Sequence, residues 1–308
     1  MPTCQQSAFQ HLRLAVLSGF LLAYAGQSAA QFELPATDIW LLDLTERDGQ
    51  VQLDERNAPV RLTRHPGYDN QPSFSHDGRQ LYFTRGDAEG YTNIMQAQLD
   101  TLDFAIKPVV ETPLSEFSAL SHWNPALNTI TMVQVQEDGA QWLVSYNPDN
   151  GNITRRDEND QVGYHSWFDK GSVVFTVADP ARLEYWPAHA ENAQLIAEDA
   201  DRGMLTAGDG KHPPQKVWLS TRDESGTSVH TWDGQRLSFV TKLPDGSQDF
   251  ARDDQGQLWT GVGSKLYRWS SQQAQWRMAA DLSAYRIRNI TRLAIHPASR
   301  RLALVAAP

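Results

Sequence analysis

Charged, polar and aromatic side chains recur at related positions along this 308-residue chain, and they are the residues best suited to hold a ligand. Arginine favours an anionic or carboxylate-bearing ligand, because a guanidinium group donates paired hydrogen bonds to a carboxylate. A divalent metal ion is an alternative ligand for Glu116, His165 and Asp249, since carboxylate and imidazole groups both ligate metals. The candidate ligand-binding residues are Asp69, Asn70, Glu116, Tyr164, His165, Arg202, Asp249 and Arg292.

Catalytic residues cannot be assigned in the same way. Ser166 lies beside His165, but neighbouring residues of a strand point to opposite faces and do not form a dyad. The chain has no G-x-S-x-G motif, which marks the nucleophile of many hydrolases. We therefore assign no catalytic residue and no metal ligand, and we expect no cofactor.

An internal repeat provides the elements that position the candidate residues. Its clearest copy, DNQPSFSHDGRQLYFTR at 69–85, reads as two strands joined by an Asp-Gly turn, a strong hairpin signal. Related starts follow at Ser115, Val162, Asp201, Ser247 and Asn289, at spacings of 39 to 47 residues. The start at Asp201 is the weakest match. Four strands in each repeat of this length predict the blades of a β-propeller.

The two ends of the repeat region predict how the ring closes. The sixth start leaves room for only two strands before Pro308. The segment TDIWLLDL at 37–44 resembles the third strand of the first full blade, TNIMQAQL at 92–99, and 60–63 can be its fourth strand. The fold class is therefore all-β: one six-bladed β-propeller, closed by N-terminal strands that pair with the C-terminal blade. Such closure covers sheet edges that would otherwise be exposed.

Propeller geometry explains why the candidate residues are expected to gather. The innermost strand of each blade runs along the central channel, so residues at its start should lie around one channel mouth. Polar groups and aromatic rings that converge at a concave mouth are typical of ligand sites. The alternative is that these residues satisfy backbone groups at the strand starts.

Other conspicuous residues favour structural roles. His76, His122 and His296 share one repeat position, but it lies at the opposite end of the inner strand, and they should lie too far apart to share a metal ion. We interpret them as surface residues. The tryptophans on or near third strands are expected to pack between blades: Trp40, Trp142, Trp186, Trp232 and Trp269.

The first 30 residues have the features of a signal peptide. Arg13 precedes the apolar run LAVLSGFLLAYA at 14–25, which is short for a membrane span, and Ser28-Ala29-Ala30 offers a cleavage site before Gln31. An uncleaved membrane anchor is the alternative. Domain boundaries are therefore 1–30 for the signal peptide and 31–308 for the propeller. We expect a periplasmic protein with no membrane span after cleavage.

The cysteine content and the net charge limit the chemistry and the partners of the mature chain. The only cysteine, Cys4, lies in the segment expected to be removed, which excludes disulfides and thiolate chemistry from the mature chain. The net charge of −10 argues against nucleic acid as a partner, because phosphate binding needs a basic surface.

The segment LTRHPGYDNQPSFSHDGRQLYFTR at 62–85 resembles the WD40-like repeat of TolB-type β-propellers. Leu62-Thr63, Pro72, Phe74-Ser75 and Asp77-Gly78 match that pattern, whereas His76 replaces its usual proline. The match is specific over one blade and degraded in the others. The whole chain also looks like a group of exported bacterial TolB-like proteins of unassigned activity. The resemblance implies the fold and the compartment. TolB proteins carry a further N-terminal α/β domain, for which we expect no counterpart in this chain, so the resemblance does not imply the role of TolB for it.

Three functions fit these observations. The first is a binding or scaffolding propeller that holds a protein segment or a small ligand of the cell envelope at the channel mouth. The alternative is a metal-dependent hydrolase or lactonase of the six-bladed kind, in which Asn70, Glu116 and Asp249 would imitate the metal shell. An accessory subunit whose partner supplies the chemistry is the third.

Overall fold

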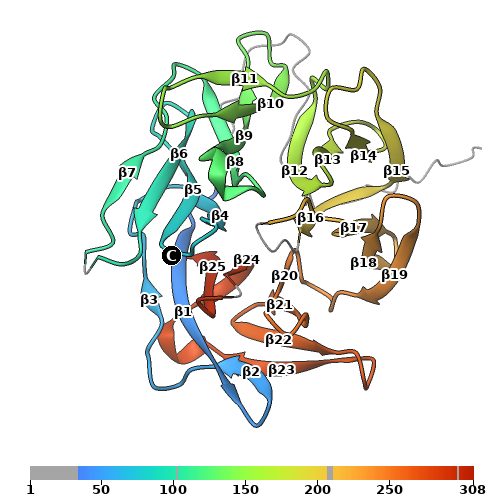
Figure 1. Cartoon of the computed structure of the whole chain (residues 1–308). Coiled ribbons are helices and arrows are strands. Elements are labelled where there is room, and N and C mark those ends of the chain that lie inside the picture. Colours follow the sequence, from blue (N-terminus) through green and yellow to red (C-terminus); the bar gives the residue numbers. More distant parts are fainter. Residues whose placement is uncertain (1–33, 102, 207–210, 297) are drawn as a thin grey trace, which may run out of the picture.

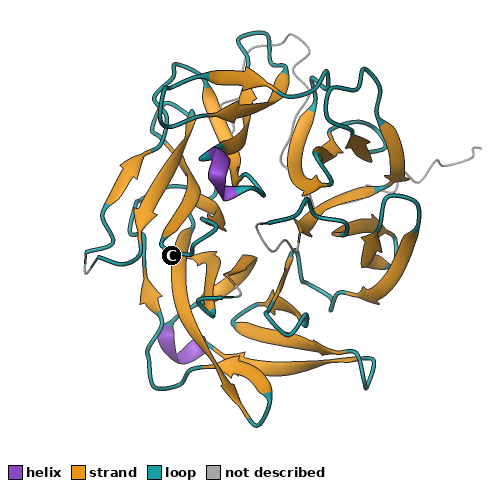
Figure 2. Ribbon diagram, viewed as in Figure 1, coloured by secondary structure: helices purple, strands orange, loops and turns teal. Residues whose placement is uncertain are grey.

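Short strands linked by tight turns form six antiparallel sheets around a central channel in the computed structural model, which describes residues 34–101, 103–206, 211–296 and 298–308 (Figure 1). Figure 2 shows that nearly all regular structure in these ranges is strand, with two single-turn 3₁₀ helices at Pro125–Leu127 and Ser283–Tyr285. The predicted all-β, six-bladed propeller is confirmed. The predicted signal peptide lies outside the described residues.

Five blades are each built from four consecutive strands, with the first strand innermost. In chain order their strands are β4 (Asp69–Phe74), β5 (Gln80–Gly86), β6 (Thr92–Gln98) and β7 (Ile106–Pro108); β8 (Ser115–Ser121), β9 (Ile130–Val135), β10 (Gln141–Tyr146) and β11 (Ile153–Arg155); β12 (Val162–Phe168), β13 (Gly171–Thr176), β14 (Arg182–Trp186) and β15 (Gln194–Glu198); β16 (Ala200–Thr206), β17 (Val217–Asp223), β18 (Gly226–Trp232) and β19 (Leu237–Lys242); and β20 (Phe250–Arg252), β21 (Leu258–Val262), β22 (Lys265–Ser270) and β23 (Gln275–Asp281). The repeat start at Asp201 therefore does begin a blade.

The sixth blade joins the two ends of the chain. Its inner strands are β24 (Arg288–His296) and β25 (Arg301–Ala307), and its third strand is β1 (Asp38–Arg47), which pairs with β25 from Asp38↔Ala306 to Asp43↔Arg301. Figure 1 shows the blue β1 running beside the red β25. The predicted ring closure is thus confirmed.

The outer position of this blade differs from the prediction. It is shared by β2 (Gln50–Leu53), which pairs with the end of β1, and by β3 (Val60–Arg61), which pairs near its start. The predicted fourth strand at 60–63 is therefore shorter than expected. Beyond Arg61, Thr63 leaves the ladder and its hydroxyl instead accepts a hydrogen bond from the Ile39 backbone N–H at 2.9 Å.

The apolar core lies between the blades. Buried β-branched and leucine side chains of neighbouring sheets pack against each other, as where Leu302 and Leu304 of β25 meet Trp259 and Leu266 of the preceding blade. The tryptophans expected to pack between blades all lie in these clusters or against them: Trp40, Trp142, Trp186, Trp232 and Trp269. Within the described ranges, no helix has the length and apolar character needed to cross a membrane.

Most of the inner strands contain an irregularity at the same depth. The register shifts in β4, β8, β12, β16 and β24 as each pairs with its second strand. Gln71, Ser118 and Asn289 take left-handed backbone conformations at these points, with φ of 55°, 56° and 50°. Bulges re-aim side chains at sites next to a channel. Here they turn residues of several blades towards its centre.

Candidate functional site

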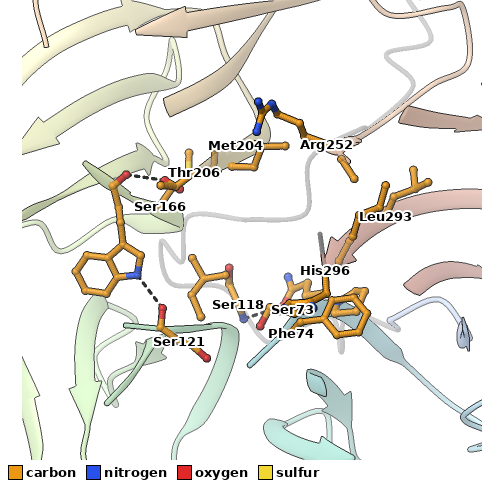
Figure 3. Close-up of a pocket in the computed structure, with 18 of the residues that line it drawn as sticks. Ser73, Phe74, Ser118, Ser121, Ser166, Met204, Thr206, Arg252, Leu293 and His296 are labelled. Atoms are coloured by element: carbon orange, nitrogen blue, oxygen red, sulfur yellow. Dashed lines mark hydrogen bonds between the residues drawn. The ribbon is translucent and has the colours of Figure 1, made fainter. Parts of the chain in front are cut away.

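Two cavities meet inside the channel. The strand-start cavity, of about 980 Å³, is lined by the starts of the inner strands and includes Asn70, Phe117 and Thr291. The strand-end cavity, of about 750 Å³, is lined by the opposite ends and is shown in Figure 3. Four residues line both cavities and separate them: Gln71, Tyr164, Arg202 and Arg292.

Two guanidinium groups form the centre of this partition. Arg292 is 8% exposed, donates a hydrogen bond to the Tyr164 hydroxyl at 2.6 Å, and lies over the Tyr164 ring at 4.8 Å. Arg202 donates to the side-chain oxygen of Gln248 at 3.0 Å and to the Thr291 carbonyl at 2.9 Å. Neither arginine forms an ion pair with any carboxylate in the part of the chain that the structure describes. Buried charges are usually paired, so this arrangement leaves positive charge available.

The two guanidinium charges affect the pKa values of two nearby tyrosines. Burial alone would raise the pKa of Tyr164, but the guanidinium charges of Arg292 and Arg202 together bring it below its ordinary value. Tyr68 lies near the same groups, and burial raises its pKa although both arginines oppose the rise. Phenol hydroxyls next to guanidinium groups add hydrogen-bond donors for an anion.

Asp249 is a carboxylate that interacts by charge with both Arg292 and Arg202 but, in the described structure, forms no ion pair with either. Its two oxygens accept hydrogen bonds from the backbone N–H groups of Phe250 at 2.9 Å and Leu293 at 3.3 Å. Burial raises its pKa, although Arg292 and Arg202 oppose the rise. Asp249 lines the strand-end cavity, so it faces the partition from the side away from the strand-start cavity.

Two predicted rim carboxylates lie elsewhere, and this corrects the expectation that they face the channel. Asp69 is fully buried and forms a bidentate pair with Arg85 of the second strand, at 2.7 and 2.9 Å. Glu116 is also fully buried, and one of its oxygens accepts hydrogen bonds from Thr112 and from Gln134. Neither lines either cavity. Asp69 is the first residue of β4 and Glu116 the second of β8, and each side chain reaches the second strand of its own blade.

Asn70 and His165 lie in different cavities. Asn70 lines the strand-start cavity and donates a long hydrogen bond to the Thr37 hydroxyl at 3.4 Å. His165 lines the strand-end cavity, and its Nε2 is 2.8 Å from the Thr131 hydroxyl. The alternative metal set of Glu116, His165 and Asp249 is therefore not brought together. Across the described part of the chain, no three His, Cys, Asp or Glu side chains form a group able to hold a metal ion.

His165 should make stability depend on pH. Burial, with a smaller contribution from Arg156, lowers its pKa to about 3, so folding favours the neutral ring. This contribution to stability is complete above the unfolded pKa of about 6.5 and is lost as the pH falls towards 3. Lowering the pH from 7 to 5 should therefore reduce the free energy of unfolding by about 2 kcal/mol through the protonation of His165 in the unfolded chain.

Urea unfolding of the wild type and of His165→Gln at both pH values measures this cost. Other titrating groups cancel in the comparison, so the wild type should lose more stability than the variant on acidification. Equal losses in the two proteins would show that His165 titrates normally.

The three repeat histidines are not surface residues in every blade. His122 and His296 are 8% and 9% exposed. The Nδ1 atom of each accepts a hydrogen bond from a backbone N–H in the following turn, from Asn124 at 3.0 Å and from Ser299 at 3.1 Å. They therefore order the turn at the end of the inner strand. The interpretation as surface residues is wrong for these two, while the expected position at the opposite end of the strand is confirmed.

Two residues beyond the eight ligand-binding candidates, Gln71 and Tyr68, also lie at this site. Gln71 lines both cavities, and its side-chain oxygen accepts hydrogen bonds from the Thr84 hydroxyl at 2.7 Å and the Ser118 N–H at 2.9 Å. Tyr68 precedes the first strand. The repeat alignment places Gln71 with Asp69 and Asn70 at the channel rim, and Pro72 is a second signal, because proline cannot donate to the ladder and marks a bulge inside a strand.

No protein-family model and no curated protein matches the chain. Solved structures do match, and TolB-like proteins are among them. Putative TolB from Agrobacterium tumefaciens has a TM-score of 0.63 at 11% identity, covering 88% of this chain and 97% of that one. TolB from Acinetobacter baumannii has a TM-score of 0.56 at 10% identity, covering 87% of this chain and 63% of that one, so this chain spans less than two thirds of that protein.

A gluconolactonase from Xanthomonas campestris shares the fold as well, with a TM-score of 0.54 at 12% identity, covering 87% of this chain and 95% of that one. At these identities the three likenesses establish the propeller fold.

Proposed function

We propose that this protein is an exported binding propeller that holds an anionic group of an envelope protein segment or small molecule in the strand-start cavity. The observation that carries the proposal is the pair of guanidinium groups of the partly buried Arg202 and the buried Arg292, neither of which forms an ion pair with a carboxylate among the described residues. Tyr68, Asn70 and Gln71 supply further polar groups on the same cavity. Aromatic and aliphatic side chains such as Phe117 and Phe175 form its apolar wall.

Calorimetric titration with inorganic phosphate, small mono- and dicarboxylates, and a short peptide with a free C-terminal carboxylate tests the proposal. At least one anionic probe should bind, and its affinity should fall as salt is raised, because screening weakens charge attraction. The amidated form of the same peptide is the matched control for the carboxylate. Absence of binding by every anionic probe would refute the assignment.

The compartment is part of the proposal, with cleavage before Gln31 and release into the periplasm. N-terminal sequencing of the protein from a periplasmic extract should begin at Gln31. A chain that keeps its first 30 residues and pellets with membranes would instead support the uncleaved anchor.

The lactonase alternative draws on the fold likeness to the gluconolactonase. The side chains favour it less, since Glu116 is turned away from the channel and the charges of two arginines lie close to Asp249. Metal analysis of untagged protein, with a gluconolactone hydrolysis assay in added Ca²⁺, separates the two functions. A stoichiometric divalent ion together with lactone turnover would place the alternative ahead.

A further inference from the structure

The strand-end cavity has its own polar wall, where β8 meets β12. Ser118 and Ser121 line it, and both are partly exposed. Figure 3 shows these two serines with Ser166 on the cavity wall. In the described ranges, no protein group bonds to the hydroxyls of Ser118 and Ser121. Each hydroxyl can therefore both donate to a ligand and accept from it.

His165 adds an acceptor to the same wall. The Thr131 hydroxyl lies 3.3 Å from the Leu120 carbonyl and 2.8 Å from His165 Nε2; we assign its one proton to the carbonyl, which makes Nε2–H the donor to Thr131. Nδ1 is then the unprotonated nitrogen, and it is buried without a partner in a side chain that is 3% exposed. His165 Nδ1 can therefore accept a hydrogen bond from a hydroxyl or N–H group of a ligand, directly or through one water molecule.

Ser166 supplies a second acceptor. The Thr206 hydroxyl donates to the Trp167 carbonyl at 2.6 Å, so the Ser166 hydroxyl, 2.6 Å away, must donate to Thr206. A lone pair on Ser166 Oγ remains free. The cavity thus combines two free hydroxyls and the His165 acceptor on its β8 side with the Ser166 acceptor on its β16 side.

The two carboxylates at the end of this cavity away from the partition have partners within the protein. Asp254 pairs with Arg300 at 2.8 Å, and Asp253 accepts a hydrogen bond from the Trp259 indole at 2.8 Å. Apolar side chains, among them Phe74, Met204 and Leu293, face the cavity between the polar groups (Figure 3). Away from Arg202 and Arg292, which belong to the anion site, a ligand with many hydroxyls and apolar C–H faces matches this lining.

We infer that the strand-end cavity binds a neutral saccharide through the Ser118 and Ser121 hydroxyls and the acceptors of His165 and Ser166. Its volume of about 750 Å³ falls within the range of roughly 300–1,000 Å³ that small-molecule sites occupy. The wall that carries Ser118 and Ser121 opens at the other end of the inner strands from the anion site proposed above, and the two cavities share only the partition between them.

Calorimetric titration of the full mature chain with glucose, N-acetylglucosamine and cellobiose tests this inference. At least one probe should bind with a Kd below about 1 mM. Ser121→Ala and His165→Gln should each weaken that binding at least about tenfold, since each removes a hydrogen bond to the ligand. Ser238→Ala, on the outer strand β19, is the matched control and should bind like the wild type.

Thermal unfolding of each variant identifies any fold defect, and Ser121 is partly exposed, so its variant remains informative if His165→Gln unfolds. Failure of all three saccharides to bind would overturn the inference. Unchanged affinity in Ser121→Ala would do the same, because the sugar would then be held elsewhere.

Discussion

An aspartate in place of Ile39 is expected to abolish the cooperative unfolding transition of this propeller. Ile39 lies in β1, is fully buried, and packs with Leu81 and Val305 in the cluster that joins the closing blade to the first full blade. The new carboxylate would be buried without a partner at the strand pair that closes the ring. We expect a loss of more than about 4 kcal/mol, a large share of the roughly 5–15 kcal/mol that stabilises a typical domain.

Calorimetry and near-UV circular dichroism measure this effect. Val60→Asp is the matched control, because Val60 belongs to the same blade but is 42% exposed, and it should change stability by less than about 0.5 kcal/mol. Deletion of residues 36–44 should be at least as damaging as Ile39→Asp. A deletion mutant that melts sharply at the wild-type temperature would disprove the role of β1 in closure.

Replacing Arg202 and Arg292 by methionine should remove anion binding while leaving the protein folded. Hydrogen bonds to charged groups contribute roughly 1.5–3 kcal/mol each, so each single variant should lose at least about tenfold in affinity and the double variant about a thousandfold. Stability should fall by only about 1–2 kcal/mol, because the loss of the hydrogen bonds to Gln248, Thr291 and Tyr164 is partly offset by removing two desolvated charges. Titration of the tightest anionic probe and thermal unfolding of the same samples measure both quantities.

Arg56→Gln is the control for a general change in net charge, since Arg56 is exposed and, among the described residues, pairs only with the neighbouring Asp54. It should leave affinity within about twofold of the wild type. If the double variant binds as tightly as Arg56→Gln does, the guanidinium pair does not form the site.

The repeat and its closure could be predicted from sequence because both rest on local patterns. Asp77-Gly78 fixes one hairpin register, and the similarity of 37–44 to 92–99 identifies a third strand wherever it lies in the chain. Tyr164, Arg202 and Arg292 line one cavity, because equivalent starts of inner strands converge at the channel.

The directions of individual side chains could not be predicted in the same way. A one-residue shift in register moves a side chain to the opposite face, and the inner strands shift at their bulges. Asp69 consequently meets Arg85 within its own blade, whereas Gln71, two residues later, reaches the channel. The burial that leaves His165 neutral likewise depends on the neighbouring blade, which no repeat alignment describes.

The pairing of β1 with β25 has a consequence for biosynthesis. β1 is made first among the described strands, yet the partner that completes its sheet lies more than 260 positions later, at Ala306 opposite Asp38. Contacts this distant in sequence slow folding and leave unpaired strands open to aggregation. The nascent chain therefore carries an apolar β1 through nearly the whole of its synthesis, and we expect it to depend on a chaperone that shields this strand until β25 arrives.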